Sequence, residues 1–329
     1  MVENLKVHLI IFFLVGCFIS STSVLADPIK VILDTDIDSD VDDVGALAML
    51  HTLADHDVVK ILGVIVTSND TYAPSCADAI NHYYKRPAIP IGVQKGLETT
   101  NFSKYTRQIS EEFPHRISSY EDAEDAISLY RRILASQEDQ SVVIISIGHL
   151  TNLRLLLESH PDEHSMLSGT ELVKAKVRMW SAMGGKFPAG KEANFYRPDP
   201  ESTVVAIANW PTRVVFAGWE TGNKVITGGE FLRKSLKQNH PVWRAYHHYN
   251  NFEGRQSWDQ LSVLYAVSSA PDDYWDLQYG EALVHSDGSN GWKMSSEVTN
   301  QAFLVEKADP TEVAKIIDAL MVGLYKPGF

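Results

Sequence analysis

The chain has 329 residues, of which 44% are hydrophobic and 22% are charged, and its formal net charge is −13. These values are typical of a globular protein that is long enough to bury a large core. The negative charge argues against a nucleic-acid partner, because phosphate backbones are bound mainly by lysine and arginine. It suits a protein that binds cations or neutral substrates.

The first 26 residues have the layout of a secretory signal peptide. An apolar run at residues 9–19 is followed by a small-residue cleavage site that ends at Ala26. The run is too short to predict a membrane span. We therefore expect export to the periplasm or the medium, with residues 27–329 as one catalytic domain. The alternative is an outer-surface lipoprotein, because Leu14-Val15-Gly16-Cys17 resembles a bacterial lipobox that would place a lipid anchor on Cys17.

From residue 30 onward, segments typical of strands alternate with segments typical of helices, which predicts an α/β fold. The sheet is expected to be open and mostly parallel, with helices on both faces. A cap formed by residues 225–300 is an alternative to a single unit, and residues 94–118 are expected to be irregular. Strands are expected at 30–33, 58–67, 89–93, 141–146, 174–182, 213–216 and 302–305, a hairpin at 281–293, and helices at 43–54, 75–85, 120–136, 153–159, 200–209, 241–251, 257–268 and 311–324.

Polar loops follow four of these strands, at residues 34–43, 68–70, 148–152 and 183–185. In open parallel sheets, ligands bind beyond the carboxyl ends of the strands, so these loops are expected to converge on one site. The first loop carries six aspartates within ten positions. Carboxylates so close together repel one another unless a cation neutralises them. The loop therefore predicts a divalent metal site with oxygen ligands.

Two interpretations of the acidic loop fit the residues poorly. Asp34, Asp36 and Asp38 have the spacing of the first EF-hand ligands. However, Ser39 replaces the glycine of that motif, and Gly45 stands where a bidentate glutamate is needed. An aspartate-nucleophile phosphatase is the second alternative, but Asp38 stands where its motif has threonine or valine.

The third interpretation is a resemblance to the inosine/uridine-preferring nucleoside hydrolase family. Residues 34–36 and 42–47 resemble its Asp-Thr-Asp and Asp-Asp-x-x-Ala-Leu signature, with a longer loop between the two parts. The resemblance covers roughly residues 29–265 and implies the Rossmann-like core of that family. Further matches follow in family order at Gly148-His149-Leu150-Thr151-Asn152, where His149 replaces proline, and at 183–185, 192–195 and 258–260.

This resemblance implies Ca²⁺-dependent hydrolysis of the N-glycosidic bond of ribonucleosides, giving ribose and free base. Ca²⁺ would coordinate the attacking water and two ribose hydroxyls, and Asp36 would be the general base. Family members are commonly dimers or tetramers, so a homo-oligomer is expected. The implied metal ligands are Asp36, Asp43, Asp259 and the backbone carbonyl of Thr151; the implied substrate contacts are Asp42, Asn69, Met183, Glu192 and Asn194, with Trp258 as a candidate for stacking on the base and Asp34 supporting the loop.

Several assignments stay open. Asp40 is an alternative to Asp42 as the ribose ligand, because the loop is longer than usual. Many family members have histidine directly before the late aspartate, where this chain has Trp258, so the acid for the leaving base is unassigned. Residues 246–252 and Arg255 are candidates for this role. An exported glycosidase for another sugar-linked substrate and a non-catalytic Ca²⁺-dependent binding protein are the alternative functions.

Overall fold

The computed structural model describes residues 27–327, so the predicted signal peptide and the alternative lipid anchor lie outside the described residues. Within residues 27–327, none of the helices has the length and apolar character needed to cross a membrane. The strands are β1 (Ile29–Thr35), β2 (Val59–Val66), β3 (Ile91–Val93), β4 (Glu124–Asp125), β5 (Val142–Ser146), β6 (Val177–Met183), β7 (Gly190–Lys191), β8 (Arg213–Ala217), β9 (Ile226–Thr227), β10 (Arg255–Gln256), β11 (Trp275–Val284), β12 (Ser289–Met294) and β13 (Gln301–Glu306).

The helices surround this set of strands. They are α1 (Asp42–Asp55), α2 (Ala73–Tyr83), α3 (Thr106–Glu112), α4 (Ala126–Ala135), α5 (Thr151–Glu158), α6 (Gly169–Lys176), α7 (Ala193–Tyr196), α8 (Pro200–Asn209), α9 (Trp219–Gly222), α10 (Glu230–Ser235), α11 (Pro241–Asn250), α12 (Trp258–Val267) and α13 (Pro310–Met321), with short 3-10 turns at Tyr120–Asp122 and Pro271–Asp273.

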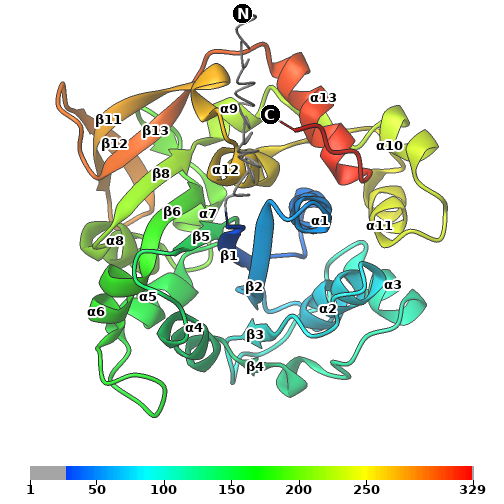
Figure 1. The fold of residues 1–329 in the computed structure, drawn as a ribbon, viewed down its shortest axis with the longest axis horizontal. Helices are drawn as coiled ribbons and strands as arrows, with labels where there is room; N and C mark the ends of the chain where they lie inside the picture. The colour runs from blue at the N-terminus through cyan, green and yellow to red at the C-terminus, as the bar shows by residue number, and fades with distance from the viewer. Residues whose placement is uncertain (1–26, 328–329) are drawn as a thin grey trace, which may run out of the picture.

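One sheet of eleven strands crosses the molecule in the order β4-β3-β2-β1-β5-β6-β8-β13-β11-β12-β7 (Figure 1). The strands from β4 to β13 are parallel, and β11, β12 and β7 add an antiparallel edge. The predicted fold, an open and mostly parallel α/β sheet, is confirmed. The hairpin expected at residues 281–293 is formed by β11 and β12, which extend the main sheet.

Each face of the sheet has its own apolar core, because successive side chains of a strand point to opposite faces. In β1, Val31 and Leu33 pack into one core and Ile32 into the other. The first core is covered by α1, α2, α11, α12 and α13, and the second by α4, α5, α6 and α8 (Figure 1). Because β1 is central and buried on both sides, the loop at its carboxyl end has a rigid support.

Two regions, residues 168–177 and residues 120–126, differ from the sequence-based expectation by more than a few residues. Residues 174–176 end helix α6, which begins with a capping box between Ser168 and Glu171, so β6 starts only at Val177. Helix α4 begins at Ala126 instead of residue 120, because the Asp125 side chain accepts the hydrogen bonds of the first-turn N–H groups. The preceding residues 124–125 pair with β3 as strand β4.

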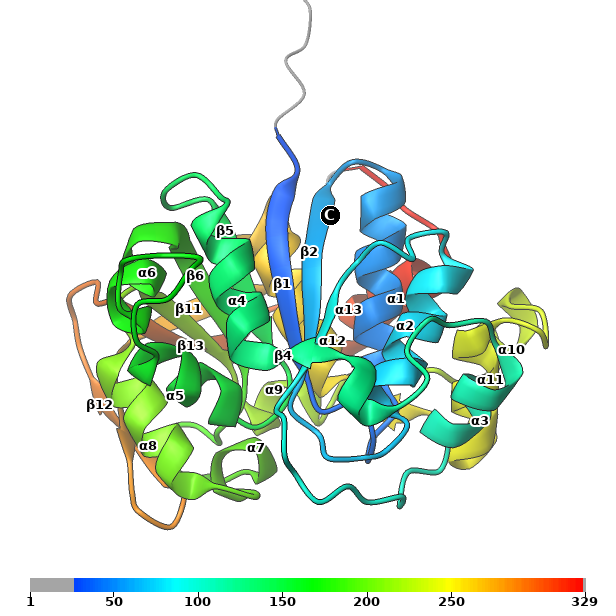
Figure 2. The ribbon, with the colours of Figure 1, turned by 90° about the horizontal axis from the view of Figure 1, so that it is seen from below.

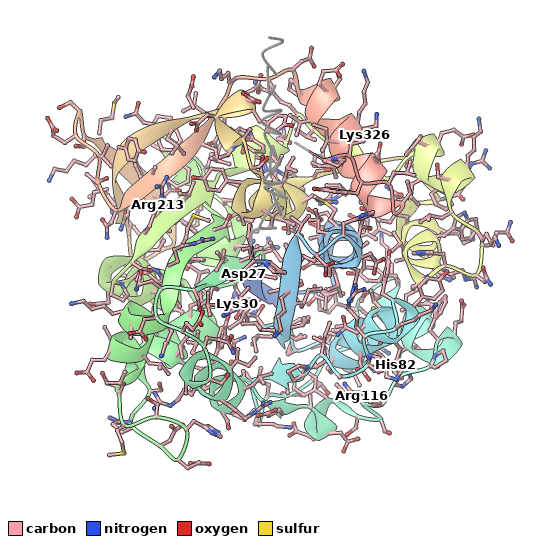
Figure 3. The ribbon with its side chains drawn as sticks, in the orientation of Figure 1. Asp27, Lys30, His82, Arg116, Arg213 and Lys326 are labelled. Atoms are coloured by element: carbon pink, nitrogen blue, oxygen red, sulfur yellow. The ribbon has the colours of Figure 1, made fainter. Side chains whose placement is uncertain are left out.

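The segment at residues 94–118, expected to be irregular, contains helix α3 and is tied to α2. Arg116 donates to the buried carboxylate of Asp78 through its side chain at 2.9 Å and its backbone N–H at 2.5 Å. His82 Nδ1 lies 3.7 Å from the same carboxylate, and Figure 3 shows His82 and Arg116 near each other at the edge of the molecule. This anchor holds the segment against α2.

Figure 2 shows β1 running from the amino end of the described chain toward the side of the molecule that carries α7 and α9. The loops that follow β1, β5 and β6 lie at this end, which is where a parallel sheet binds its ligands.

Candidate active site

A cavity of ≈ 390 Å³ lies beyond the carboxyl ends of the central strands. It brings together eight of the ten predicted site residues, namely Asp36, Asp42, Asp43, Met183, Glu192, Asn194, Trp258 and Asp259. Asn69 and Thr151 are not among its lining residues. The remaining lining is formed by Ser39, Asp40, Ile147, His149, Lys191, Ala193, Tyr196, Arg197, Trp219 and Arg255.

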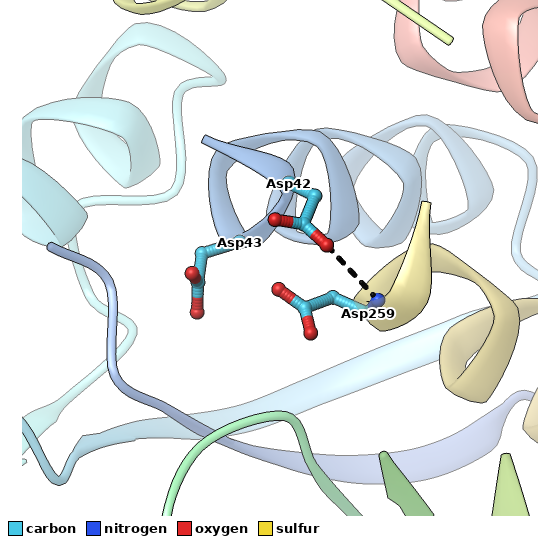
Figure 4. A group of neighbouring side chains, drawn as sticks. All are labelled: Asp42, Asp43 and Asp259. Carbon is cyan, nitrogen blue, oxygen red and sulfur yellow. Dashed lines mark hydrogen bonds between the residues drawn. The ribbon is translucent and has the colours of Figure 1, made fainter. Parts of the chain in front are cut away.

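Three buried carboxylates form the tightest acidic group in this cavity. Asp42, Asp43 and Asp259 each offer an oxygen, and these oxygens lie within 4.8 Å of one another (Figure 4). The backbone N–H of Asp259 donates to Asp42 Oδ2 at 3.3 Å. Burial and the neighbouring carboxylates raise the pKa of Asp43 and of Asp259 well above the usual range, and burial is the main cause that raises the pKa of Asp42 to about 7.

These residues fit a hard divalent cation. The donors are all oxygen atoms, and Asp42 Oδ1 is buried without a hydrogen-bond partner among the described residues. Thr35 Oγ1, at the end of β1, donates to Asp43 Oδ1 and thereby orients that carboxylate. A cation would relieve both the repulsion between the carboxylates and the cost of burying them.

Asp36 lines the same cavity but lies outside this close group of three. Burial and the charge of Asp43 raise its pKa well above the usual range. Its backbone packs against Gly148, where an added Cβ would lie 2.6 Å from Asp36 N. The glycine of the third predicted loop is therefore needed for close approach to the first loop.

Two further aspartates of the loop have structural contacts. Asp34 is fully buried and accepts a hydrogen bond from the Tyr130 hydroxyl at 2.6 Å, and burial raises its pKa to about 7. Asp38 accepts a hydrogen bond from the Ser68 hydroxyl, which fixes the enlarged loop to the end of β2. Neither Asp34 nor Asp38 lines the cavity.

Both carboxylate oxygens of Asp40 already have partners within the protein. Its Oδ2 lies 2.6 Å from Arg255 Nη2, and its Oδ1 accepts a hydrogen bond from the Tyr249 hydroxyl at 2.9 Å. Asp42, in contrast, keeps one unpartnered oxygen. This geometry favours Asp42 over Asp40 as the carboxylate available to a ligand.

A second group of lining residues is organised around Glu192. Its Oε2 accepts a hydrogen bond from the backbone N–H of Gly185 at 3.0 Å, and its Oε1 accepts one from Asn194 at 2.9 Å. Gly185 has a φ of +77°, a backbone conformation that favours glycine. Burial raises the pKa of Glu192 to about 7. Asn194 Nδ2 lies 3.1 Å from Met183 Sδ, so both residues are held at the same wall.

The two remaining predicted residues, Asn69 and Thr151, are not among the residues that line the cavity. Asn69 Nδ2 donates to the backbone carbonyl of Glu98 at 2.8 Å, so its amide is used to bind the segment after β3. Thr151 Oγ1 lies 3.2 Å from His149 Nδ1, and the ligand role of the Thr151 carbonyl stays a prediction. His149 is half-buried in the cavity wall, and loss of solvent around its ring lowers its pKa to about 4, which keeps the ring neutral at pH 7.

The histidines of α11 do not reach the cavity. The His247 ring stacks on Trp243 with centroids 5.0 Å apart, and His248 Nε2 lies 3.6 Å from Glu112. By contrast, Trp219 lines the cavity although its segment was not among the predicted site loops. Trp219 lies two residues beyond the carboxyl end of β8, so the rule that located the other loops could have found it. Its carbonyl accepts a hydrogen bond from Trp258 Nε1 at 3.0 Å.

Comparison with known proteins gives the same family as the motifs. The model of the family "Inosine-uridine preferring nucleoside hydrolase" matches residues 31–319. The pyrimidine-specific ribonucleoside hydrolase RihA of Salmonella newport (strain SL254) is 31% identical over 118 residues, which are 36% of this chain and 35% of that protein. The match thus spans about a third of the curated relative's length.

Solved structures show the same fold at low sequence identity. A plant nucleoside hydrolase, PpNRh1, superposes with a TM-score of 0.67 at 18% identity, covering 90% of this chain and 99% of that chain. The inosine-uridine preferring nucleoside hydrolase of Bacillus anthracis superposes with a TM-score of 0.66 at 17% identity, also covering 90% and 99%.

Proposed function

Because the chain belongs to the inosine-uridine preferring nucleoside hydrolase family, we propose that it hydrolyses the N-glycosidic bond of ribonucleosides, giving ribose and free base. The observation that supports this most directly is the composition of the cavity. Three close carboxylates and Asp36 line the same cavity as Glu192 and Asn194. Such a site can hold a cation and a polyhydroxylated ring at the same time.

The cation that we propose is Ca²⁺, because the donors are carboxylates and the site is partly open. Asp43 and Asp259 would hold it, with Asp36 or Asp42 as a further ligand. When bound, it would lower the pKa of a water molecule and orient two sugar hydroxyls.

The chain's own carboxylates would then carry out proton transfer and sugar binding. Asp36 would take the proton of the attacking water as general base. Asp42, through its free oxygen, would accept a hydrogen bond from the ribose 2-prime hydroxyl. Glu192 and Asn194 would hold the far side of the sugar, which orients it as oxocarbenium character develops in the transition state.

The test is release of reducing sugar from uridine and inosine in the presence of Ca²⁺. Asp36→Asn should lower kcat by about 10²–10⁴-fold, the usual contribution of a general base. Asp55→Asn is the matched control, because Asp55 is an exposed carboxylate in α1 that pairs with Arg86 at 2.6 Å outside the cavity. No ribose release by the wild type from either nucleoside would contradict the proposal.

A second candidate is a glycosidase for another sugar-linked substrate. It is motivated by Trp258, which lines the cavity where many relatives have histidine. This candidate predicts Ca²⁺ binding together with poor turnover of both uridine and inosine. Efficient turnover of either nucleoside would remove it. A third candidate is a non-catalytic Ca²⁺-dependent binding protein, for which the wild type should turn over no nucleoside. Wild-type turnover that is abolished in Asp36→Asn would contradict it.

We further propose that the protein is exported and acts as a homo-oligomer. The apolar run at residues 9–19 and the site ending at Ala26 support export to the periplasm or the medium. Amino-terminal sequencing of the mature protein would give Asp27 after cleavage at this site. A mature chain that begins with lipidated Cys17 would instead establish the lipoprotein alternative.

A further inference from the structure

Arg255 is a fixed cation in the wall of the cavity. Its guanidinium lies 2.6 Å from Asp40 Oδ2 and its Cζ lies 4.7 Å from the centroid of the Trp258 ring. Its Nε is buried and has no hydrogen-bond partner among residues 27–327. Arg255, Asp40 and Trp258 all line the cavity. The arginine therefore lies in the cavity wall with one side of its guanidinium paired with Asp40 and with a buried Nε–H that has no protein acceptor.

The enlarged acidic loop is what holds this arginine. The Tyr249 hydroxyl donates to Asp40 Oδ1 at 2.9 Å, and the Tyr105 hydroxyl donates to the Asp40 backbone carbonyl at 2.6 Å. Asp40 is thus fixed from two sides, and its second carboxylate oxygen is left for Arg255. A charged pair held in this way keeps the guanidinium in one orientation.

The position of Arg255 relative to the sugar site suggests which part of a substrate it meets. Trp258 directly precedes Asp259, one of the three close carboxylates. The Arg255 guanidinium lies over the face of the Trp258 ring. A ribose held between these carboxylates and Asn194 would project its base along the cavity wall formed by Trp258 and Trp219. This wall offers aromatic rings for stacking. Of the cationic side chains that line the cavity, Lys191, Arg197 and Arg255, Arg255 is the one that lies over Trp258.

We propose that Arg255 stabilises negative charge on the departing base, and that Asp40 is the positioning residue that holds it; this rests on the proposed function. Arginine stays protonated at any working pH, so it cannot give a proton to the base. The C1′–N bond breaks with its electron pair moving to the base, the water oxygen bonds to C1′, and Asp36 takes the proton of that water. The base leaves as an anion and takes its proton from solvent.

This role selects a class of substrate. Bases such as uracil and hypoxanthine spread negative charge onto carbonyl oxygens, which accept hydrogen bonds from a guanidinium. Adenine has no carbonyl oxygen and depends more on protonation of the ring. The site should therefore favour nucleosides of oxo-substituted bases over adenosine.

The test compares uridine with 4-nitrophenyl β-D-ribofuranoside, whose leaving group is a stable anion without assistance. Arg255→Gln should lower kcat for uridine by about 10²–10³-fold, as for loss of one preorganised donor, and leave kcat for the nitrophenyl riboside nearly unchanged. Arg255→Lys should restore part of the loss. Arg244→Gln is the matched control, because Arg244 pairs with Glu112 at 2.6 Å and does not line the cavity.

Asp40→Asn should show the same dependence on the leaving group with a smaller loss, and the double variant should lose less than the two single losses combined. Equal losses on both substrates, a change in KM alone, or adenosine turnover as fast as uridine turnover would overturn the role of Arg255. If Arg255→Gln does not fold, Arg255→Lys, which keeps the positive charge but changes the donor geometry, is compared with the wild type on the same two substrates. A wild type that cleaves neither riboside would instead contradict the proposed function itself.

Discussion

The backbone N–H of Asp259 donates to Asp42 Oδ2 at 3.3 Å and joins the starts of α12 and α1, which are 217 residues apart in the chain. The bond fixes two of the three close carboxylates relative to each other (Figure 4). Their mutual repulsion is therefore a property of the folded protein and not of one mobile loop. A bound cation should therefore offset this repulsion and increase the free energy of unfolding.

The first prediction concerns Asp43→Asn in the presence and absence of Ca²⁺. Without metal, the variant should melt at a higher temperature than the wild type, because it removes one buried charge from a repelling group. With Ca²⁺ the order should reverse. A ligand at 100 times its Kd adds about 2.7 kcal/mol to the wild type, and the variant should lose most of this. Thermal melts with chelator and with Ca²⁺ measure both differences.

The control for this comparison is Asp57→Asn, an exposed aspartate outside the cavity, which should respond to Ca²⁺ as the wild type does. Equal Ca²⁺-dependent stabilisation of the wild type and Asp43→Asn would show that Asp43 does not hold the cation.

The second prediction is the pH dependence of the metal-free protein. Burial raises the pKa of Asp34 from 3.8 to about 7, so the folded state binds this proton more tightly than the unfolded state does. The stabilisation is complete below pH 4 and is lost as the pH rises toward 7. Asp34→Asn keeps an acceptor for the Tyr130 hydroxyl and removes the titration. Its stability relative to the wild type should increase from pH 5 to pH 8 in chelator.

Chemical denaturation at several pH values measures this difference. A constant difference between Asp34→Asn and the wild type across this pH range would show that Asp34 does not titrate there.

Parts of the site that are formed by neighbouring residues in the sequence were predicted better than parts formed by residues that are distant in the sequence. The acidic loop predicts a divalent metal site because a buried strand, a loop of six aspartates and a helix start follow one another directly. The resemblance to the family, and not this local pattern, implies that Asp43 is one of its ligands. Asp259 could be placed beside it only through the order of family motifs. The pair between Asp40 and Arg255 joins segments with no local signal in the sequence, so the sequence predicts only that Asp40 is an alternative to Asp42 as the ribose ligand. Asn69 was assigned to the sugar, but the segment after β3 uses its amide.

The fold was predicted more completely than the site, since alternation of strand and helix is a local property. Helix α6 was missed although its capping box at Ser168 and Glu171 is a helix-start signal, because its last residues, 174–176, lead directly into β6 and were assigned to the expected strand. The antiparallel edge formed by β11 and β12 follows from long-range pairing with β13, which the hairpin signal at Asp287-Gly288 does not specify.

The third prediction contrasts two neighbouring arginines of α4. Arg131 is buried and makes hydrogen bonds with Asp162 at 2.7 and 3.0 Å and with the carbonyls of Ser165 and Leu167 at 2.9 Å. Arg131→Ala should lower the free energy of unfolding by about 3–5 kcal/mol, because it leaves these groups unpaired. Arg132 pairs with Glu124 at the surface, so Arg132→Ala should cost about 0.2–1 kcal/mol. Urea denaturation of both variants is the measurement, and equal losses would contradict the prediction.

The fourth prediction tests the contact between the first and third loops. In Gly148→Ala, the new Cβ would lie 2.6 Å from Asp36 N and 2.7 Å from Thr67 Oγ1, so the backbone that carries the proposed general base must shift. We expect a loss of about 1–3 kcal/mol in stability, as for overpacking, together with a fall in kcat of about 10²-fold from misplacement of Asp36. Gly291→Ala is the control, since its Cβ meets nothing closer than 3.9 Å. If Gly148→Ala lost stability but kept full kcat, the position of Asp36 would not depend on this close contact.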